Sequence, residues 1–311
     1  LWYRGRDVIQ LARERTIEDV AALLWVDDVA ESVLAPTRAR DAEPEWDQAD
    51  LEPIARFASI LQLQSARDFG AYDLRRERLL ASGTGIVAEF ASAVAGTAWT
   101  DGPLTESLAT ALAPATEGAS RLLDAALILC ADHELNVSSF TVRCIASAGA
   151  PLPSALAGGL AALTGIRHGG ATLRAEALLA EVERQGDARR VVAGRMRRGE
   201  PFPGFGHRLY PDGDPRARVL LDLLAATLPD DTVVIAGRET VEAVRDLVGE
   251  EPTIDVALAM LVRAFGLPSG SALTVMALGR TIGWVAHALE EYARGRLIRP
   301  RAKYVGATAE G

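Results

Sequence analysis

The chain has 311 residues, of which 49% are hydrophobic and 24% are charged, and its 33 basic and 42 acidic side chains give a formal charge of −9 at pH 7. These values are ordinary for a globular protein and exclude a disordered or collagen-like chain. The acidic balance argues against a nucleic-acid binder, because affinity for phosphate backbones comes mainly from clustered Lys and Arg. The length predicts two domains.

Helical periodicity dominates the chain from its start. Thr16, followed by two acidic residues, predicts the first turn of a helix whose buried face holds Val20, Leu23 and Leu24 at helical spacing. Further along, Asp214 can cap a helix and Pro215 suits its first position. Since hairpin signals are nearly absent, the sequence predicts an all-α fold.

Four segments of the chain depart from a simple helical pattern. Residues 35–50 and 103–117 are polar and contain prolines, so both are predicted to be loops. Residues 232–236 form the one run that could be a strand. The uncharged run 144–166 is long enough to cross a membrane, but its prolines and glycines predict a buried helix pair joined by a turn.

A change of composition predicts how the domains are arranged. Long apolar helices give way to an arginine-rich region near Gly170 and resume after Leu258. This change predicts a small helical domain, residues 172–261, inserted into a large one formed by residues 1–171 and 262–311.

The two cysteines, Cys130 and Cys144, lie in apolar surroundings. Two thiols cannot form a disulfide scaffold, so we expect reduced core cysteines in a cytoplasmic protein.

Three of the four histidines stand in polar or glycine-rich settings. His133 lies among acidic residues, and glycines adjoin His168 and His207, which lets the backbone approach a ligand. A helical zinc motif starting at His133 would need a second histidine where Val137 stands, so no metal site is predicted. His287, on an apolar helical run, is expected to be a satisfied core residue. For any one of these histidines alone, bridging two helices is the commoner role.

Six segments, in order along the chain, resemble motifs of the citrate synthase family. The most specific is Gly204-Phe205-Gly206-His207-Arg208-Leu209-Tyr210, continuing through Asp214-Pro215-Arg216-Ala217. The others are Tyr3-Arg4-Gly5, Asp132-His133-Glu134-Leu135-Asn136, His168-Gly169-Gly170-Ala171, the looser Pro252-Thr253-Ile254-Asp255, and Ile298-Arg299-Pro300-Arg301-Ala302 with Tyr304. The resemblance spans essentially the whole chain.

The resemblance implies a homodimer with a large and a small helical domain in each subunit, which close over oxaloacetate before the acyl-CoA binds. It implies condensation of acetyl-CoA with oxaloacetate to give citrate and CoA, with no tightly bound cofactor, no nucleic acid and no membrane. Asp255 would take the methyl proton, His168 would hydrogen-bond the thioester oxygen, and His207 would polarise the oxaloacetate carbonyl.

The resemblance also implies the binding residues. The oxaloacetate carboxylates would be held by His133, Arg216 and Arg280, with Arg299 reaching into the partner subunit's site. Candidates for binding CoA are Phe205, Gly206, Arg195, Arg197 and Arg198. Each arginine could instead be a solvated surface residue, and Asp255 could be an ordinary helix cap.

Several residues depart from the family pattern next to the expected acyl pocket. Thr253 replaces the usual Asn, Thr172 replaces another Asn, and residues 256–259 replace the usual aromatic and Ser-Gly run. Two alternatives therefore stay open. One is 2-methylcitrate synthase, which uses propionyl-CoA, because one methylene changes selectivity by only about 1–3 kcal/mol. The other is a catalytically silent ligand sensor. The presence of His168, His207 and Asp255 together argues against it, because a binding protein has no need of the proton-abstracting carboxylate.

Overall fold

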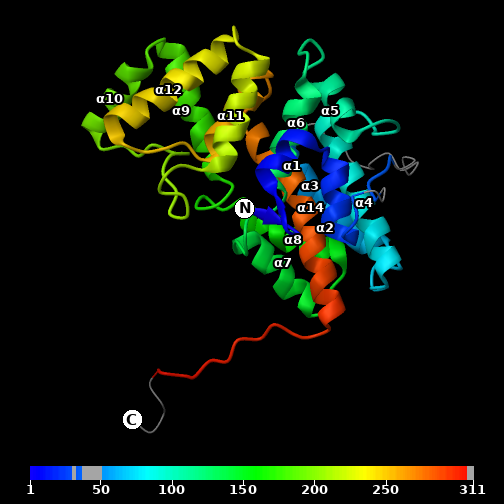
Figure 1. The fold of residues 1–311 in the computed structure, drawn as a ribbon. Coiled ribbons are helices and arrows are strands. Elements are labelled where there is room, and N and C mark those ends of the chain that lie inside the picture. Colours follow the sequence, from blue (N-terminus) through cyan, green and yellow to red (C-terminus); the bar gives the residue numbers. More distant parts are fainter. Residues whose placement is uncertain (30–32, 37–50, 307–311) are drawn as a thin grey trace.

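The computed structural model describes residues 1–29, 33–36 and 51–306. In these residues the chain forms fourteen helices and two short strands (Figure 1). The strands are β1 (Trp2–Tyr3) and β2 (Arg6–Asp7), and the helices are α1 (Val8–Glu14), α2 (Ile17–Val26), α3 (Pro53–Arg67), α4 (Arg76–Ala95), α5 (Leu104–Leu112), α6 (Ala119–Ala131), α7 (Val137–Ser147), α8 (Leu152–Leu163), α9 (Ala171–Gln185), α10 (Ala188–Arg198), α11 (Pro215–Thr227), α12 (Thr232–Val248), α13 (Ile254–Ala264) and α14 (Ser271–Arg294). The strands form one antiparallel pair, so the all-α prediction is confirmed.

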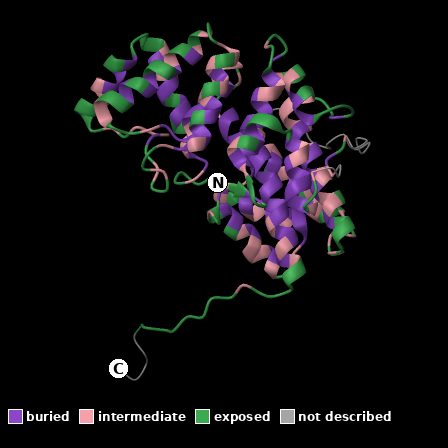
Figure 2. Ribbon diagram, viewed as in Figure 1, coloured by how far each residue is buried: buried purple, intermediate pink, exposed green. Residues whose placement is uncertain are grey.

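Helix α14 is the central helix of the fold and packs against α2, α3, α4, α6, α7 and α8. It is long and apolar enough to cross a membrane by length and composition, but 94% of its most apolar stretch is buried inside the molecule. Figure 2 shows this buried centre as the purple part of the ribbon. An all-round apolar helix in such a position is typical of a protein core.

Two glycines let α14 pass very close to α6. A Cβ on Gly279 would lie 2.6 Å from the carbonyl oxygen of Leu127, and one on Gly283 would lie 2.0 Å from that of Ala131. Only residues without a side chain fit this approach, since real Cβ atoms do not come so near to backbone oxygen. The close packing brings the α14 residues Arg280 and His287 next to the end of α6, where the site is built.

Helices α9, α10, α11 and α12 gather on one side of the molecule (Figure 1), and α11 packs against α1 and α6. Helix α13 packs against α9, α11 and α12, and also against α14. Helices α9 and α13 therefore link this group to the central helix. His168 lies just before α9, His207 lies in the loop between α10 and α11, and Asp255 lies in the first turn of α13.

The predicted helix starts agree with the structure. Thr16 caps α2 in a complete capping box, in which Asp19 returns a contact to the Thr16 backbone. Asp214 caps α11 with Pro215 in the first turn. The uncharged run 144–166 forms the end of α7, a turn and α8, as expected.

Two local predictions were wrong. Residues 103–117 were expected to be a loop, but Leu104 and Leu108 lie one helical turn apart and are both buried, so this segment forms α5. Residues 232–236, the possible strand, form the first turns of α12, because Asp231 accepts two backbone N–H groups as its cap. Of the predicted loop at 35–50, residues 37–50 lie outside the described part of the chain.

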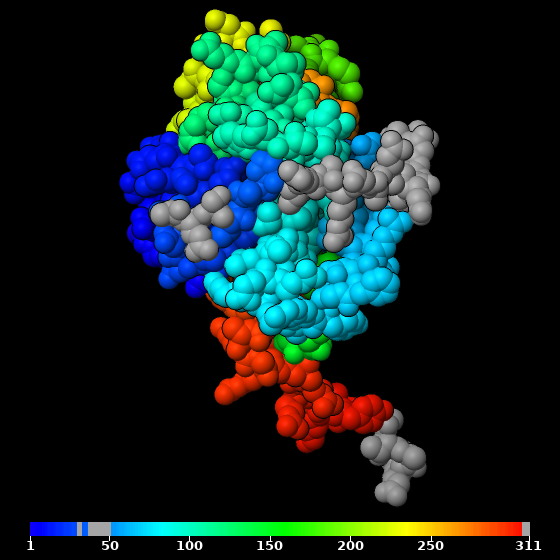
Figure 3. All heavy atoms as spheres, turned by 90° about the vertical axis from the view of Figure 1, so that its right-hand side faces the viewer, coloured from blue at the N-terminus to red at the C-terminus, as the bar shows by residue number. Residues whose placement is uncertain are grey.

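The chain leaves the body of the molecule after α14. Figures 1 and 3 show residues 296–306 running outward as an extended segment. This segment carries Arg299, whose side chain is exposed.

Candidate active site

The loop between α6 and α7 carries His133. Asp132 ends α6, and Asn136 begins α7 by accepting the backbone N–H of Ser139. Between them Glu134 has a φ of 53°, in the left-handed region that non-glycine residues seldom adopt. The loop buries His133, whose Nε2 lies 2.7 Å from the hydroxyl of Tyr210. This contact joins α6 to the loop before α11.

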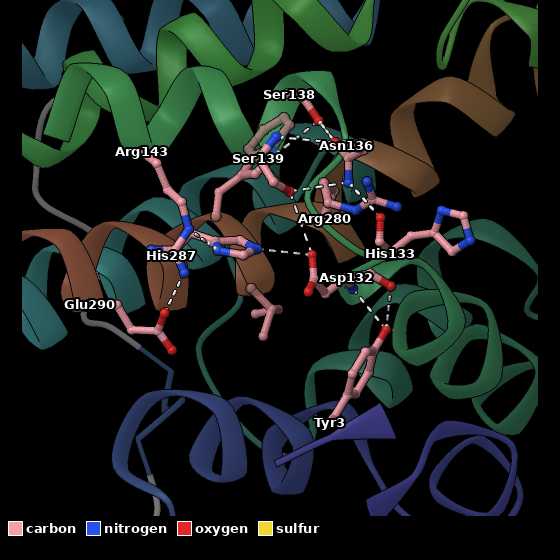
Figure 4. Close-up of polar contacts among 12 residues, drawn as sticks. Tyr3, Asp132, His133, Asn136, Ser138, Ser139, Arg143, Arg280, His287 and Glu290 are labelled. Atoms are coloured by element: carbon pink, nitrogen blue, oxygen red, sulfur yellow. Dashed lines mark hydrogen bonds and ion pairs between the residues drawn. The ribbon is translucent and has the colours of Figure 1, made fainter. Parts of the chain in front are cut away.

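Asp132 is fixed from two directions (Figure 4). The Tyr3 hydroxyl accepts the Asp132 N–H at 2.8 Å and lies 2.8 Å from the Asp132 carbonyl oxygen. His287 lies with its Nε2 3.1 Å from Asp132 Oδ1, and Arg143 donates from Nε to His287 Nδ1 at 2.8 Å. Because Nδ1 must accept, the neutral ring of His287 carries its proton on Nε2 and donates it to Asp132. His287 is thus satisfied, as expected, but it also supports the His133 loop.

The loop Gly204–Tyr210 brings His207 to the same place. Gly204 and Gly206 have φ values of 84° and 73°, a conformation that favours glycine. The Gly206 N–H donates to the carbonyl oxygen of Glu251, and the Thr253 N–H donates to that of Gly204, so this loop pairs with the approach to α13. The His207 ring centre lies 5.7 Å from that of His133.

Tyr210 lies between the two histidines. Its ring centre is 5.6 Å from that of His133 and 5.1 Å from that of His207. The guanidinium carbon of Arg216 lies 5.8 Å from the Tyr210 ring centre. These four residues form the site cluster, a name used below for His133, His207, Tyr210 and Arg216.

Arg216 is buried beside Asp214. The Asp214 carboxylate accepts Arg216 Nε at 3.0 Å and Nη2 at 2.8 Å, and it also accepts the backbone N–H of Ile254 at 3.1 Å. Burial by itself would lower the pKa of Arg216, but Asp214 holds it above its ordinary value. Asp214 therefore connects the site cluster to the first turn of α13, where Asp255 lies.

Arg280 is the second buried cation. Its Nε donates to the carbonyl oxygen of Cys130 at 2.6 Å, whereas its buried Nη1 has no hydrogen-bond partner in the described residues. Burial, reinforced by Arg216 and Arg280, lowers the pKa of His133 to about 3. The His133 ring is therefore neutral at pH 7, and the positive charge of the site is on the arginines.

His168 lies just before α9. Its Nε2 is 3.0 Å from the hydroxyl of Ser138, a buried residue of α7 that also receives the Trp284 indole N–H at 3.3 Å. Burial, aided by the charge of Arg280, lowers the pKa of His168 to about 4. This ring, too, is neutral at pH 7.

Asp255 is the second residue of α13 and is partly buried. Burial raises its pKa, and this rise is opposed by a hydrogen bond from Thr253 and by the charge of Arg216. A carboxylate with a raised pKa in such a setting is suited to general-base work.

The residues predicted to bind CoA lie in two separate segments. Phe205 and Gly206 lie in the same loop as His207. At the end of α10, Arg195 pairs with Glu181 at 2.6 Å, Arg198 contacts Glu200, and Arg197 is exposed. Among the described residues, no group of three or more His, Cys, Asp or Glu side chains could hold a metal ion.

Three residues of the site were not singled out from the sequence. Tyr210 lies inside the most specific motif, which was a usable signal. Asp214 was predicted to be a helix cap and lies in the same motif, but no role in the site was assigned to it. Ser138 gave no signal, because its contact with His168 spans 30 residues of sequence.

Comparisons with known proteins identify the family of the chain. A profile of the family described as citrate synthase, C-terminal domain, matches residues 1–301. Relatives from Mycobacterium tuberculosis are 41% identical over 189 residues, which is 59% of this chain and 51% of theirs, so the chain spans about half the length of these relatives. The citrate synthase of Haloferax volcanii is 30% identical over 342 residues, covering 98% of this chain and 89% of that protein.

A solved structure extends the likeness to the fold. The crystal structure of citrate synthase from Thermotoga maritima matches with a TM-score of 0.74 at 26% identity, over 98% of this chain and 89% of that chain. With the family profile covering nearly the whole sequence, the chain belongs to the citrate synthase family.

Proposed function

We propose that this protein condenses acetyl-CoA with oxaloacetate to give citrate and CoA. The observation that carries the proposal is the pair of buried arginines, Arg216 and Arg280, beside neutral His133. Asp214 connects Arg216 to the first turn of α13, where the partly buried Asp255 lies. A dianion needs cations that water does not screen, and the abstraction of a carbon-bound proton needs a base in a site of low polarity.

Oxaloacetate binding is assigned to the two buried arginines and His133. The Arg280 Nη1 atom is buried without a hydrogen-bond partner in the described residues, and a substrate carboxylate would supply one. Asp214 uses one edge of the Arg216 guanidinium, which leaves the other edge for a second carboxylate. Neutral His133 adds a hydrogen bond without adding charge.

Proton abstraction is assigned to Asp255, with His168 as the donor to the thioester oxygen. The methyl proton moves to the carboxylate as negative charge develops on that oxygen. A neutral ring has one N–H, and the Ser138 hydroxyl beside Nε2 donates its hydrogen to Asn136 Oδ1 at 2.7 Å. A donor at Nδ1 therefore requires that hydrogen to turn from Asn136 to Nε2. A fixed donor in a dry site stabilises this charge better than water does.

Carbon–carbon bond formation is assigned to the side of the site that holds His207. The enolate carbon attacks the oxaloacetate carbonyl carbon, and the C=O π bond breaks as the new carbon–carbon bond forms. His207 hydrogen-bonds the carbonyl oxygen and donates the proton that converts it to a hydroxyl. Water then cleaves the thioester and CoA leaves as the thiol. Phe205 and Gly206 are placed beside the CoA adenine; Arg195, Arg197 and Arg198 are weaker candidates for its phosphates, because two of them already pair with carboxylates.

We also propose a homodimer in which Arg299 of the partner subunit completes the oxaloacetate site. Support comes from the extended segment that carries Arg299 away from the body, and from exposed apolar side chains around the start of α7, namely Leu135, Val137 and Phe140. Residues 172–261 would form the small domain that closes on the larger one.

The proposal is tested by measuring release of the free CoA thiol from acetyl-CoA or propionyl-CoA in the presence of oxaloacetate. Oxaloacetate-dependent release from acetyl-CoA supports the proposal. Faster release from propionyl-CoA would instead identify a 2-methylcitrate synthase. Tight oxaloacetate binding with no release from either donor would indicate a ligand sensor and overturn the enzymatic proposal.

A further inference from the structure

The hydroxyl of Thr253 lies between two acceptors. Its Oγ1 is 2.8 Å from Oδ2 of Asp255 and 3.0 Å from the carbonyl oxygen of Gly204, and the residue is only 4% exposed. A hydroxyl has one hydrogen and can donate to one of these acceptors at a time. The Gly204 oxygen already accepts the Thr253 backbone N–H at 2.8 Å. The hydroxyl hydrogen is therefore available for the Asp255 carboxylate.

We propose that Thr253 is a positioning residue for proton abstraction, which orients the ionised Asp255 carboxylate and lowers its proton affinity. The inference rests on the proposed function of Asp255 as the base. While Asp255 is ionised, Thr253 donates to Oδ2. After the methyl proton has moved to the carboxyl group, that group is a weaker acceptor, and the hydroxyl hydrogen turns to the Gly204 oxygen without movement of heavy atoms.

The other charged and titratable groups facing Asp255 cannot replace this hydrogen bond. Arg216, in the first turn of α11, favours the ionised carboxylate, and its neighbour Asp214 disfavours it. From α6, the buried thiol of Cys130 faces the same region, and burial raises its pKa to about 11, so it stays uncharged. Of the influences that oppose the effect of burial on the pKa of Asp255, the Thr253 hydrogen bond is larger than the charge of Arg216.

The contact with Gly204 gives the hydroxyl a second consequence. Gly204 begins the loop that carries His207. Its carbonyl oxygen accepts the Thr253 backbone N–H and lies 3.0 Å from the Thr253 hydroxyl, which donates to it only when the hydrogen turns away from Asp255. The hydrogen bonding of the Gly204 carbonyl oxygen, at the start of the His207 loop, therefore changes with the protonation state of Asp255.

The inference is tested by titrating Asp255 in the full-length protein labelled with 13C at the Asp side-chain carboxyl carbons. The Asp255 signal is assigned as the one missing from Asp255→Asn. Thr253→Val removes the donor at nearly constant shape, and Thr253→Ser keeps it. We expect Thr253→Val to raise the Asp255 midpoint by about one pH unit or more, and Thr253→Ser to titrate like the wild type.

The same variants are then assayed for CoA release against pH. The acid limb of kcat/KM for acetyl-CoA should move upward in Thr253→Val by the shift seen in the titration, and Thr253→Ser should restore it. Thr253→Ala serves as a second variant without a donor if Thr253→Val does not fold. An active wild type whose Asp255 midpoint is the same with and without the hydroxyl would overturn the role of Thr253 alone. A wild type that releases no CoA would overturn the proposed function, and with it the catalytic part of this inference.

Discussion

Two groups of arginines in this molecule differ in their surroundings. At the end of α10, Arg195 and Arg198 have partly or well exposed side chains and pair with Glu181 and Glu200. In the site, Arg216 and Arg280 are each 3% exposed. Exposed ion pairs contribute little because water screens them, whereas a buried charge interacts strongly with whatever lies beside it. The number of arginines in a segment is therefore a poor guide to an anion site, and burial is a better one.

The buried arginines also differ from each other. Arg216 has its own carboxylate partner, Asp214, which keeps the guanidinium charged in a buried position. Burial lowers the pKa of Arg280, whose side chain is hydrogen-bonded to a backbone carbonyl oxygen. A buried charge without an ionic partner lowers the free energy of unfolding, and a bound anion offsets this loss. Arg280 is therefore the arginine whose environment should change most when a dicarboxylate binds.

The largest expected effect comes from removing the charge of the base. Asp255→Asn should lower turnover by about a thousandfold, because the amide cannot take a proton. Oxaloacetate affinity, measured by calorimetry, should change by less than about threefold, because the arginines remain. Asp246→Asn, at an exposed residue of α12, is the matched control. Near-wild-type turnover in Asp255→Asn would remove Asp255 from its assigned role.

A buried carboxyl group with a raised pKa should affect stability. Burial raises the pKa of Asp124 from 3.8 to about 6, against hydrogen bonds from Ile17 and Thr105. The folded state then holds a proton that the unfolded state releases, so this group favours folding below about pH 4 and loses that contribution as the pH rises through about 6. The loss is on the order of 2–3 kcal/mol.

Asp124→Asn should remove this dependence, because the amide keeps the acceptor for Ile17 and carries no charge. We expect its unfolding midpoint in urea to exceed that of the wild type at pH 7 and to vary less between pH 4 and pH 7. A midpoint below the wild type by the same amount at both pH values would show that the carboxyl does not titrate in this range.

The comparison of the two arginine groups is tested directly by a pair of substitutions. Arg280→Met should raise the KM for oxaloacetate about 10- to 100-fold, the loss expected for a charged hydrogen bond. Arg198→Met, which removes the same charge from an exposed helix end, should leave that KM within about twofold. Equal effects of the two substitutions would contradict the importance given to burial.

A smaller effect is expected at the extended C-terminal segment. Arg299→Ala should raise the KM for oxaloacetate about tenfold if the side chain reaches the partner's site as a partly exposed contact. The oligomeric state should be measured by light scattering on the same sample. A dimer with an unchanged KM would show that Arg299 lies outside the site.

The sequence was most informative where a property is local. Helix starts at Thr16 and Asp214 were predicted because a cap needs only the residues that follow it. The helix α5 was not predicted, because the prolines and polar residues of segment 103–117 indicated a loop. The sequence did contain a signal, because Leu104, Leu108 and Leu112 recur at helical spacing, but the helix is short.

The candidate site was predictable in its residue types but not in its contacts. Ordered motifs identified His133, His207 and Arg216 as candidates. The hydrogen bond from His133 to Tyr210 spans 77 residues of sequence, and the one from His287 to Asp132 spans 155. Such contacts depend on how α6, α11 and α14 pack, and that packing depends on glycines whose importance is visible only once the helices are placed.

The central claim is the formation of a bond between the acyl methyl carbon and the carbonyl carbon of oxaloacetate. It is tested most directly by 13C NMR of the products formed from acetyl-CoA labelled at the methyl carbon. We expect the label to become a methylene carbon of citrate, with one CoA thiol released for each citrate formed. Label recovered only as free acetate would show thioester hydrolysis without condensation and would contradict the account.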